Sequence, residues 1–249
     1  MLECYDLNFS YGKRQILKDI NFSFKEGEFV GLLGANGSGK STLFKSILGI
    51  LKHDGKIILE NTNTANYTTK ELANKIGYIP QKSGLSMPLS VAEFVLMGLY
   101  SNNAFKGYGK KENEELDFVL EYLNISDFKH RNILSLSGGE FSKVLMARAI
   151  IKKPKVLLLD EPTAALDLNY AIFLMQMCKE LSQKGILVVM IIHELNLAAK
   201  FCSRFLALKN GELFKDGDKY EIFTKENLKS IFDLDCEILN QDERLIITY

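Results

Sequence analysis

A glycine-rich segment at residues 34–41, GANGSGKS, has the residue types and spacing of a phosphate-binding loop, GxxxxGK[ST]. Its three glycines let successive backbone N–H groups turn inward around phosphate oxygens, in conformations that a side chain would obstruct. Lys40 adds a mobile positive charge for the β- and γ-phosphates, and the Ser41 hydroxyl can coordinate Mg²⁺. The expected phosphate contacts come from Gly34, Asn36, Gly37, Ser38, Gly39, Lys40, Ser41 and Thr42.

The flanking sequence supports this interpretation of the loop. An apolar run, FVGLL, precedes it and predicts a strand, and a helix is expected over about residues 41–50. The positive N-terminal end of that helix adds to the attraction for phosphate. A glycine-rich turn that binds nothing is the alternative, and the position between a strand and a helix disfavours it.

Two adjacent carboxylates, Asp160 and Glu161, follow the apolar run VLLL. The run predicts a buried strand that delivers both carboxylates at its C-terminal end, where ligands bind in open α/β sheets. We expect Asp160 to hold Mg²⁺, directly or through water. We expect Glu161 to orient the water that attacks the γ-phosphate and to act as general base. Alone, the pattern would fit any strand that runs into a loop, and the phosphate-binding loop upstream favours a functional role.

The sequence LSGGE at residues 136–140 adds a second helix N-terminus with flanking glycines. With the phosphate-binding loop and the Asp-Glu pair in this order, the chain resembles the ATP-binding cassette (ABC) family over essentially its whole length. The resemblance implies that ATP is bound and hydrolysed in a head-to-tail sandwich of two copies. In that sandwich the ATP of one copy is contacted by residues of the other copy, here Ser137, Gly138, Gly139 and Glu140.

Four further positions match smaller elements of the family. The resemblance implies that Tyr11 stacks on adenine, although an aromatic residue in FSYG also fits a place in the core. It implies that Gln81 lies at a hinge to a helical subdomain, with a part in catalysis and in Mg²⁺ binding. Asp167, in the segment ALD, would lie where two subunits touch. His193 would contact the γ-phosphate as a catalytic residue, although a lone histidine at a strand end is more often structural.

The sequence also departs from the family pattern next to the signature LSGGE. Glu140 stands where Gln is frequent, and Phe141 and Ser142 follow where Arg-Gln or similar is usual. We expect that these two residues could loosen contacts around the signature helix. Glu194 follows His193 where Asp is frequent, a change that we expect to be mild.

Composition limits the class of protein. The 249 residues include 31 Lys plus Arg and 31 Asp plus Glu, so no net field favours nucleic acid. The four cysteines lie far apart in the sequence, which indicates reduced structural thiols. The N-terminus lacks the pattern of a signal peptide, and the longest apolar run, residues 186–192, is far shorter than the roughly 20 residues of a membrane-spanning helix. Any transport role therefore requires a separate membrane-embedded partner.

The patterns and the resemblance together predict an α/β fold of the P-loop ABC ATPase type. It would have a mixed sheet core, an N-terminal antiparallel β subdomain and an inserted helical subdomain. We expect a single domain over residues 1–249, with the core at about 1–81 and 137–249 and the insert at about 82–136. Helices are expected from Ser90, over 114–123, over 137–152 and over 219–232, with a surface loop over 102–115 and a hairpin over 205–217.

The branch of the family is indicated by three stretches of sequence. PLSVAEFVLMGL, IIHELNLAAKFCSR and EIFTKENLKSIFDLDCEIL resemble importers of iron–siderophore complexes, haem and cobalamin. That resemblance implies membrane permease subunits, indirectly a substrate-binding protein, and a peripheral position at the cytoplasmic face of the membrane. The groove beside residues 83–89, with Leu85, Met87 and Leu89, is one candidate docking surface, although these side chains could equally be buried.

Other functions remain open from the sequence. Importers for zinc or manganese are close alternatives, and so is a soluble ABC ATPase of an assembly scaffold, such as one for iron–sulfur clusters. A nucleotide-gated clamp on DNA or ribosomes is disfavoured by the zero net charge and the single cassette in the chain.

Overall fold

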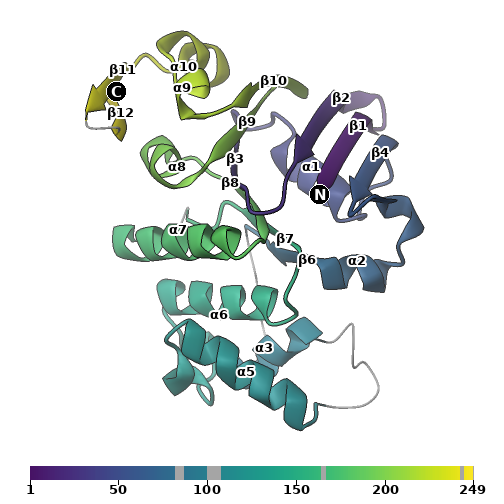
Figure 1. The fold of residues 1–249 in the computed structure, drawn as a ribbon, viewed down its shortest axis with the longest axis vertical. Helices are drawn as coiled ribbons and strands as arrows, with labels where there is room; N and C mark the ends of the chain where they lie inside the picture. Colours follow the sequence, from purple (N-terminus) through teal and green to yellow (C-terminus); the bar gives the residue numbers. More distant parts are fainter. Residues whose placement is uncertain (82–86, 100–107, 164–166, 242–243, 249) are drawn as a thin grey trace.

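The structure is a computed structural model that describes residues 1–81, 87–99, 108–163, 167–241 and 244–248. These residues form a four-stranded antiparallel sheet, a six-stranded core sheet and a two-stranded sheet, with helices packed around them (Figure 1). No helix within the described ranges is both long and apolar enough to cross a membrane.

The N-terminal part of the chain builds the antiparallel sheet, whose strand order is β2-β1-β4-β5. Its strands are β1 (Leu2–Tyr11), β2 (Arg14–Phe24), β4 (Asp54–Leu59) and β5 (Thr62–Asn63). One face of this sheet is buried and the other is exposed, as period-two alternation produces. The predicted antiparallel β subdomain is confirmed.

The core sheet has the order β10-β9-β3-β8-β7-β6, and all neighbours except β10 and β9 are parallel. Every residue of the three central strands is buried, as expected for a parallel sheet covered on both faces. The strands are β3 (Phe29–Leu33), β6 (Ile76–Ile79), β7 (Val156–Asp160), β8 (Leu187–Ile191), β9 (Arg204–Lys209) and β10 (Glu212–Gly217).

Successive residues of the central strands point into two different hydrophobic cores. In β3, Val30 and Leu32 pack with the antiparallel sheet and α1, whereas Phe29 and Leu33 pack with α6, α7 and α8. The helices are α1 (Lys40–Ile47), α2 (Thr69–Lys75), α3 (Val91–Leu96), α5 (Lys110–Tyr122), α6 (Gly138–Ile150), α7 (Leu168–Gln183), α8 (Leu195–Phe201), α9 (Lys219–Ile222) and α10 (Lys225–Phe232).

The helical layer has α6 at its centre. In Figure 1, α7 lies on one side of α6, toward the core sheet, and α3 and α5 lie on the other side. Helix α3 begins as predicted, because Ser90 and Glu93 cap it reciprocally. The division of the chain into a core and an insert over residues 82–136 stays a prediction.

Several elements differ from those predicted. Helix α5 begins at Lys110 rather than near 114, because the backbone N–H of Gly109 donates to Glu112 at 2.8 Å and starts the helix early. The loop expected over 102–115 is therefore shorter at its C-terminal end. The helix expected over 219–232 is two helices, because Thr224 caps α10 separately. The chain ends in an unpredicted hairpin, β11 (Glu237–Gln241) and β12 (Arg244–Thr248).

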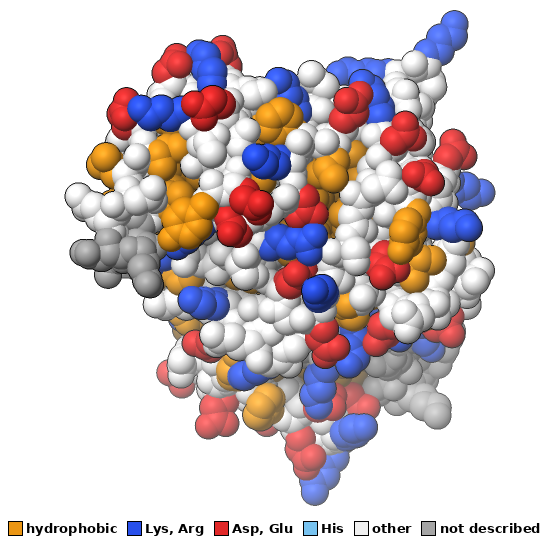
Figure 2. All heavy atoms as spheres, turned by 45° about the horizontal axis from the view of Figure 1, so that its top comes forward, with side chains coloured by type: hydrophobic (Ala, Val, Ile, Leu, Met, Phe, Trp, Pro, Cys, Tyr) orange, Lys and Arg blue, Asp and Glu red, His pale blue; other side chains and the backbone are white. Residues whose placement is uncertain are grey.

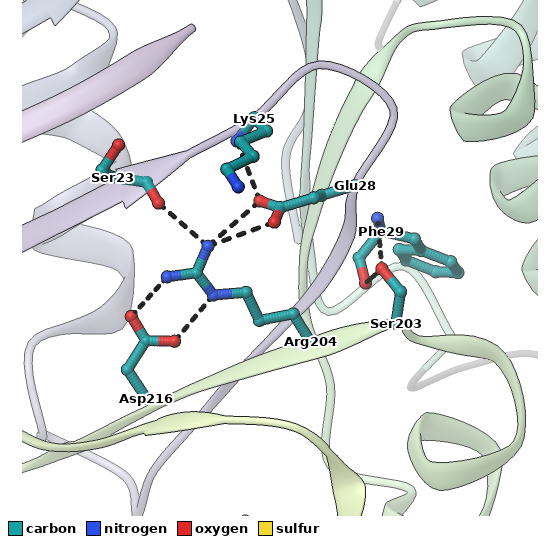
Figure 3. Close-up of polar contacts among 7 residues, drawn as sticks. All are labelled: Ser23, Lys25, Glu28, Phe29, Ser203, Arg204 and Asp216. Atoms are coloured by element: carbon teal, nitrogen blue, oxygen red, sulfur yellow. Dashed lines mark hydrogen bonds and ion pairs between the residues drawn. The ribbon is translucent and has the colours of Figure 1, made fainter.

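Arg204, at the start of β9, ties the antiparallel sheet to the core sheet (Figure 3). Its Nε and Nη2 donate to the two carboxylate oxygens of Asp216 at 2.8 and 2.7 Å. Its Nη1 donates to the carbonyl oxygen of Ser23 in β2 at 2.9 Å and lies 3.2 Å from Oε1 of Glu28. This single guanidinium therefore links β2, β10 and the turn before β3. Strand β3 in turn leads into the phosphate-binding loop.

Candidate active site

The phosphate-binding loop runs from the end of β3 to the start of α1 in a backbone conformation that requires glycine. Gly34, Gly37 and Gly39 all have positive φ, at 147°, 80° and 106°. A Cβ on Gly34 would also lie 2.5 Å from both the carbonyl oxygen of Leu208 and Oγ of Ser38. The positive φ values at these three positions, and the lack of space for a Cβ at Gly34, therefore favour glycine in this loop.

Two polar side chains of this loop, those of Ser38 and Lys40, are buried. The Lys40 ammonium donates to the carbonyl oxygens of Gly34 at 2.7 Å and Ala35 at 3.0 Å. Its burial lowers the pKa of Lys40, while Glu161 works against that shift. Among the described residues, Oγ of Ser38 is a buried polar atom without a hydrogen-bond partner. An orphaned hydroxyl in the same glycine-rich loop as a buried lysine fits an anionic ligand.

The loop is connected to the carboxylates at the end of β7. Ser41, at the start of α1, donates from Oγ to Oδ1 of Asp160 at 3.3 Å. Asp160 is 5% exposed, and this burial raises its carboxyl pKa, opposed chiefly by the hydrogen bond from Ser41. A hydroxyl and a carboxylate side by side are hard oxygen donors, so this pair fits Mg²⁺.

Glu161 lies at the centre of a three-residue cluster. Gln81 donates from Nε2 to Oε2 of Glu161 at 2.5 Å, and Nε2 of His193 lies 2.8 Å from Oε1. The three residues follow β6, β7 and β8, which are neighbouring parallel strands, so their C-terminal ends meet at one edge of the sheet. Glu161 also has positive φ, 52°, which is uncommon outside glycine and often marks a functional position.

Tyr11 lies at the end of β1 and is 51% exposed. It contacts Phe9 edge to face, with ring centroids 4.7 Å apart. The ring is therefore available for stacking rather than being part of the core, which was the alternative in the sequence analysis.

The signature turn, residues 136–140, begins α6. Ser137 caps the helix by accepting from the backbone N–H of Glu140 at 3.3 Å, and Glu140 accepts from the backbone N–H of Ser137 at 2.8 Å. Arg131 donates to Glu140 at 2.8 Å, and this bond, with that from Ser137, lowers the Glu140 pKa to about 2. In the described part of the chain, no hydrogen bond joins the signature turn to the phosphate-binding loop.

Asp167 and Phe141, one of the residues that depart from the family pattern, have structural partners. Asp167 caps α7 by accepting from the backbone N–H of Tyr170 at 3.1 Å, and Ala165 and Leu166 lie outside the described residues. Phe141 stacks on Phe94 of α3, with centroids 5.9 Å apart, and packs against the buried core. The ring of Phe141 therefore adds contacts to the signature helix, and the effect of the pair Phe141 and Ser142 on that helix stays a prediction.

Sequence reasoning missed two residues near these elements. Arg131 precedes the signature turn and pairs with Glu140, and no sequence pattern marks it as a partner. Tyr170 follows the Asp167 cap and packs against Gly139. Its only sequence signal is an aromatic residue one helical turn after a capping aspartate.

The chain surface carries charges of both signs. Figure 2 shows Lys, Arg, Asp and Glu side chains interspersed over one face, with separate apolar side chains between them. This mixture agrees with the zero formal net charge of the chain.

Comparison with known proteins identifies the family. The model of the ABC transporter family matches residues 17–164. The chain belongs to the ABC transporter family. It is 38% identical to an uncharacterized ABC transporter ATP-binding protein of Methanocaldococcus jannaschii, covering 94% of this chain and 92% of that protein. It is 34% identical to the iron(3+)-hydroxamate import ATP-binding protein of Bacillus subtilis, covering 96% and 90%.

Solved structures agree with this assignment. A transporter described as being of metal-chelate type, in an inward-facing conformation, matches with a TM-score of 0.86 and 31% identity over 100% of this chain and 97% of that chain. The ADP conformation of an ATP-binding cassette matches with a TM-score of 0.85 and 27% identity over 94% and 98%. The chain is thus the ATP-binding ATPase subunit of an ABC transporter, a complex that also contains membrane permease subunits.

Proposed function

We propose that this ABC ATPase powers the uptake of a metal chelate, of the iron–siderophore, haem or cobalamin type, through a separate permease at the cytoplasmic face of the membrane. The observation that carries this proposal is the set of relatives named for petrobactin import in Bacillus anthracis and iron(3+)-hydroxamate import in Bacillus subtilis, 32% and 34% identical over at least 90% of both chains. A substrate-binding protein would deliver the chelate. The ATPase itself need not touch it.

The nucleotide is proposed to bind between Tyr11 and the phosphate-binding loop, residues 34–42. The adenine would stack on the exposed Tyr11 ring, and Lys40 would leave the carbonyl oxygens of Gly34 and Ala35 for the β- and γ-phosphates. Ser38, whose hydroxyl lacks a partner among the described residues, would donate to a phosphate oxygen.

Ser41 and Asp160 are proposed to hold Mg²⁺ with the phosphates, and Gln81 would approach it from the next strand. When bound, Mg²⁺ neutralises charge on the β- and γ-phosphate oxygens. The hydrogen bond between Ser41 and Asp160 already holds these two ligands together, so little reorganisation of the protein is needed.

Glu161 is proposed to be the general base. Its carboxylate would accept a proton from the water whose oxygen forms a bond to the γ-phosphorus, while the bond from that phosphorus to the β–γ bridging oxygen breaks and ADP leaves with the electron pair. Gln81 and His193 hold one carboxylate oxygen each and so fix its plane. His193 would contact the γ-phosphate when the site closes.

Two copies are proposed to close around two ATP molecules. Ser137 and Gly138 begin a helix with no hydrogen bond to their own phosphate-binding loop among the described contacts, and a Cβ on Gly138 would meet nothing within 4 Å. This open helix N-terminus would therefore bind the γ-phosphate held by the other copy. Hydrolysis and phosphate release would remove the bridging charge and open the dimer.

The permease is proposed to dock in a groove of about 450 Å³ between α1, α2, β6 and α6. Ile50 and Met97 line it with exposed side chains, at 63% and 41%, and its charged lining residues are both basic, Arg148 and Lys152. A permease segment with an apolar face and an acidic side chain complements this groove. The groove also contains Pro80, the residue before Gln81, so docking there would be linked to the active site.

The docking surface predicted from the sequence, residues 83–89, falls only in part within the described residues. Leu85 lies outside the described residues, Met87 is 62% exposed, and Leu89 packs against the buried core. Of the two predicted docking residues that the structure describes, Met87 is thus the one on the surface.

Uptake measurements test the function. In cells that lack this chain, import of a radio-iron siderophore or haem should be lost, restored by the wild-type chain and not restored by Glu161→Gln. Restoration of zinc or manganese uptake alone would replace the metal-chelate assignment with the alternative importer. Isolation of the chain in a fully soluble complex, without a multi-spanning membrane protein, would favour the iron–sulfur scaffold instead.

A further inference from the structure

The ring of Tyr170 packs directly against the backbone of Gly139. A Cβ on Gly139 would lie 2.5 Å from Cδ2 of Tyr170 and 2.6 Å from two further ring atoms. Gly139 does not have positive φ, because it lies inside α6. Glycine is therefore required at position 139 because the Tyr170 ring needs the space, and not because of an unusual backbone conformation. Gly138 differs, since a Cβ there meets nothing within 4 Å.

Tyr170 also belongs to the first turn of α7. Its backbone N–H donates to Oδ1 of Asp167, the residue that caps this helix, at 3.1 Å. Asp167 follows Glu161 on the same segment, after the end of β7. The side chain of Tyr170 thus connects the turn that begins α6 with the turn that begins α7.

A second contact holds the same two helices one turn further along. The Lys143 ammonium of α6 lies 4.5 Å from the ring centroid of Phe173 and 5.7 Å from that of Tyr170, both in α7. Gly139 and Lys143 are separated by one helical turn, as are Tyr170 and Phe173, so matching faces of α6 and α7 meet.

We propose that Tyr170 is a positioning residue that fixes the signature turn relative to the Asp167 turn, so that both move as one unit toward a second copy. This inference rests on the proposed two-copy sandwich. In that arrangement the signature turn holds the γ-phosphate of the partner's ATP, and Asp167 lies six residues after the general base Glu161 in the chain. A small misplacement of one turn relative to the other would slow hydrolysis.

The position of the ring carries this role. Within the described residues, the contacts of Tyr170 are made by its ring and its backbone N–H. Tyr170→Phe should therefore behave as the wild type, and Tyr170→Ala should leave the two turns free to shift.

The first experiment separates nucleotide binding from turnover. For Tyr170→Ala we expect an unchanged Kd for a fluorescent ATP analogue at the monomer and a kcat lower by about tenfold, with full rescue by Tyr170→Phe. An unchanged kcat in Tyr170→Ala, or an equal loss in Tyr170→Phe, would overturn the inference. A general folding defect would lower binding and turnover together.

The second experiment changes the size of the side chain at both positions, Gly139 and Tyr170. Gly139→Ala should impair turnover because its methyl group displaces the Tyr170 ring. In the Tyr170→Ala background the same methyl group finds room, so adding Gly139→Ala should cost much less, a non-additive pair. Equal losses from Gly139→Ala in both backgrounds would show that Gly139 acts on the nucleotide alone, and the inference would be wrong.

The third experiment distinguishes this inference from the proposed function. Glu161→Gln should form a dimer with ATP, and adding Tyr170→Ala should raise the dimer dissociation constant by about tenfold. If Glu161→Gln alone forms no dimer, the proposed sandwich is wrong, and with it the inference. If Glu161→Gln dimerises and Tyr170→Ala changes nothing, the sandwich stands and the role of Tyr170 is refuted.

Discussion

Glu161 and His193 meet at the C-terminal edge of the core sheet, with Nε2 of His193 2.8 Å from Oε1 of Glu161. Gln81 donates to the other carboxylate oxygen. Glu161 is therefore held from two sides, by one residue from the end of each neighbouring strand. Such a carboxylate is fixed in direction before any nucleotide arrives, and this preorganisation is what a general base in phosphoryl transfer requires.

Replacing Glu161 by Gln tests its role as base. The amide keeps the size of the side chain and cannot accept the proton, so we expect ATP hydrolysis to fall by at least about 100-fold. ATP binding should be retained, and an ATP-dependent dimer should appear in size-exclusion chromatography. His193→Ala should lower hydrolysis as well, whereas His53→Ala should not, because the ring of His53 forms a hydrogen bond with the backbone carbonyl of Asp54 and not with Glu161. Normal turnover in Glu161→Gln would remove Glu161 from this role.

Ser137→Arg tests whether the signature turn acts on the ATP of a second copy. The larger, charged side chain would fill the open helix N-terminus, where a Cβ on Gly138 meets nothing within 4 Å. We expect the variant to bind ATP at its own phosphate-binding loop and to form no ATP-dependent dimer in the Glu161→Gln background. Lys40→Ala is the matched comparison and should weaken ATP binding itself. Full dimerisation of the Ser137→Arg chain would contradict the cross-subunit arrangement.

Arg204→Lys tests the tie between the two sheets. Lysine keeps the charge but cannot bridge Asp216, Glu28 and the carbonyl oxygen of Ser23 at once (Figure 3). We expect the free energy of unfolding, measured with urea, to fall by about 2 kcal/mol.

A surface ion pair provides the control for Arg204→Lys. Lys110 is 93% exposed beside Glu114, at 67%, so Lys110→Ala should change the free energy of unfolding by less than about 0.5 kcal/mol. An equal effect of both substitutions would show that the Arg204 contacts contribute no more than an exposed pair.

Glu140→Gln tests the electrostatics of the signature turn. The bonds from Arg131 and from the Ser137 backbone lower the Glu140 pKa from its usual 4.5 to about 2. A carboxyl whose pKa is lower in the folded state stabilises the fold above its unfolded pKa and loses that effect as the pH falls through the folded pKa. The melting temperature of the wild type should therefore exceed that of Glu140→Gln at neutral pH, and the difference should shrink between pH 4.5 and about 2.

Arg131→Met checks the cause of that shift. Without the guanidinium, Glu140 loses its largest stabilising partner, so Arg131→Met should lower the melting temperature at neutral pH, with a loss that also shrinks as Glu140 is protonated. A constant difference between wild type and Glu140→Gln across this pH range would mean that the pairing contributes nothing to stability.

The arrangement of the site follows in part from local patterns in the sequence. The apolar run before Glu161 predicted its place at the C-terminal edge of the sheet, whereas the places of Gln81 and His193 at the site were implied only by the family resemblance. The sequence patterns do not predict which of these side chains form hydrogen bonds with one another. That Glu161 accepts from both neighbours depends on strand order, and β8 lies between β3 and β7 although it follows them in the chain.

Contacts between distant segments account for the parts that were not predicted. The packing of Phe141 was not predicted, because its partner Phe94 lies on α3 and only the tertiary packing brings the two rings together. The C-terminal hairpin was missed for a similar reason. Its strand β12 is held by Asn196 of α8, whose side chain pairs with both backbone groups of Ile247 at 2.8 and 3.0 Å.

Ile50→Asp tests the docking groove. The Ile50 side chain is 63% exposed at the rim of the groove, so an aspartate there should leave folding, ATP binding and the ATPase activity of the isolated chain unchanged. It should disrupt an apolar contact with the permease, and co-purification with detergent-solubilised membranes should fall by about tenfold or more. Phe118→Asp is the matched control, because Phe118 is 67% exposed but lies outside this groove. Retention of Ile50→Asp on the membrane at the wild-type level, or equal loss in the control, would place the permease contact elsewhere on the surface.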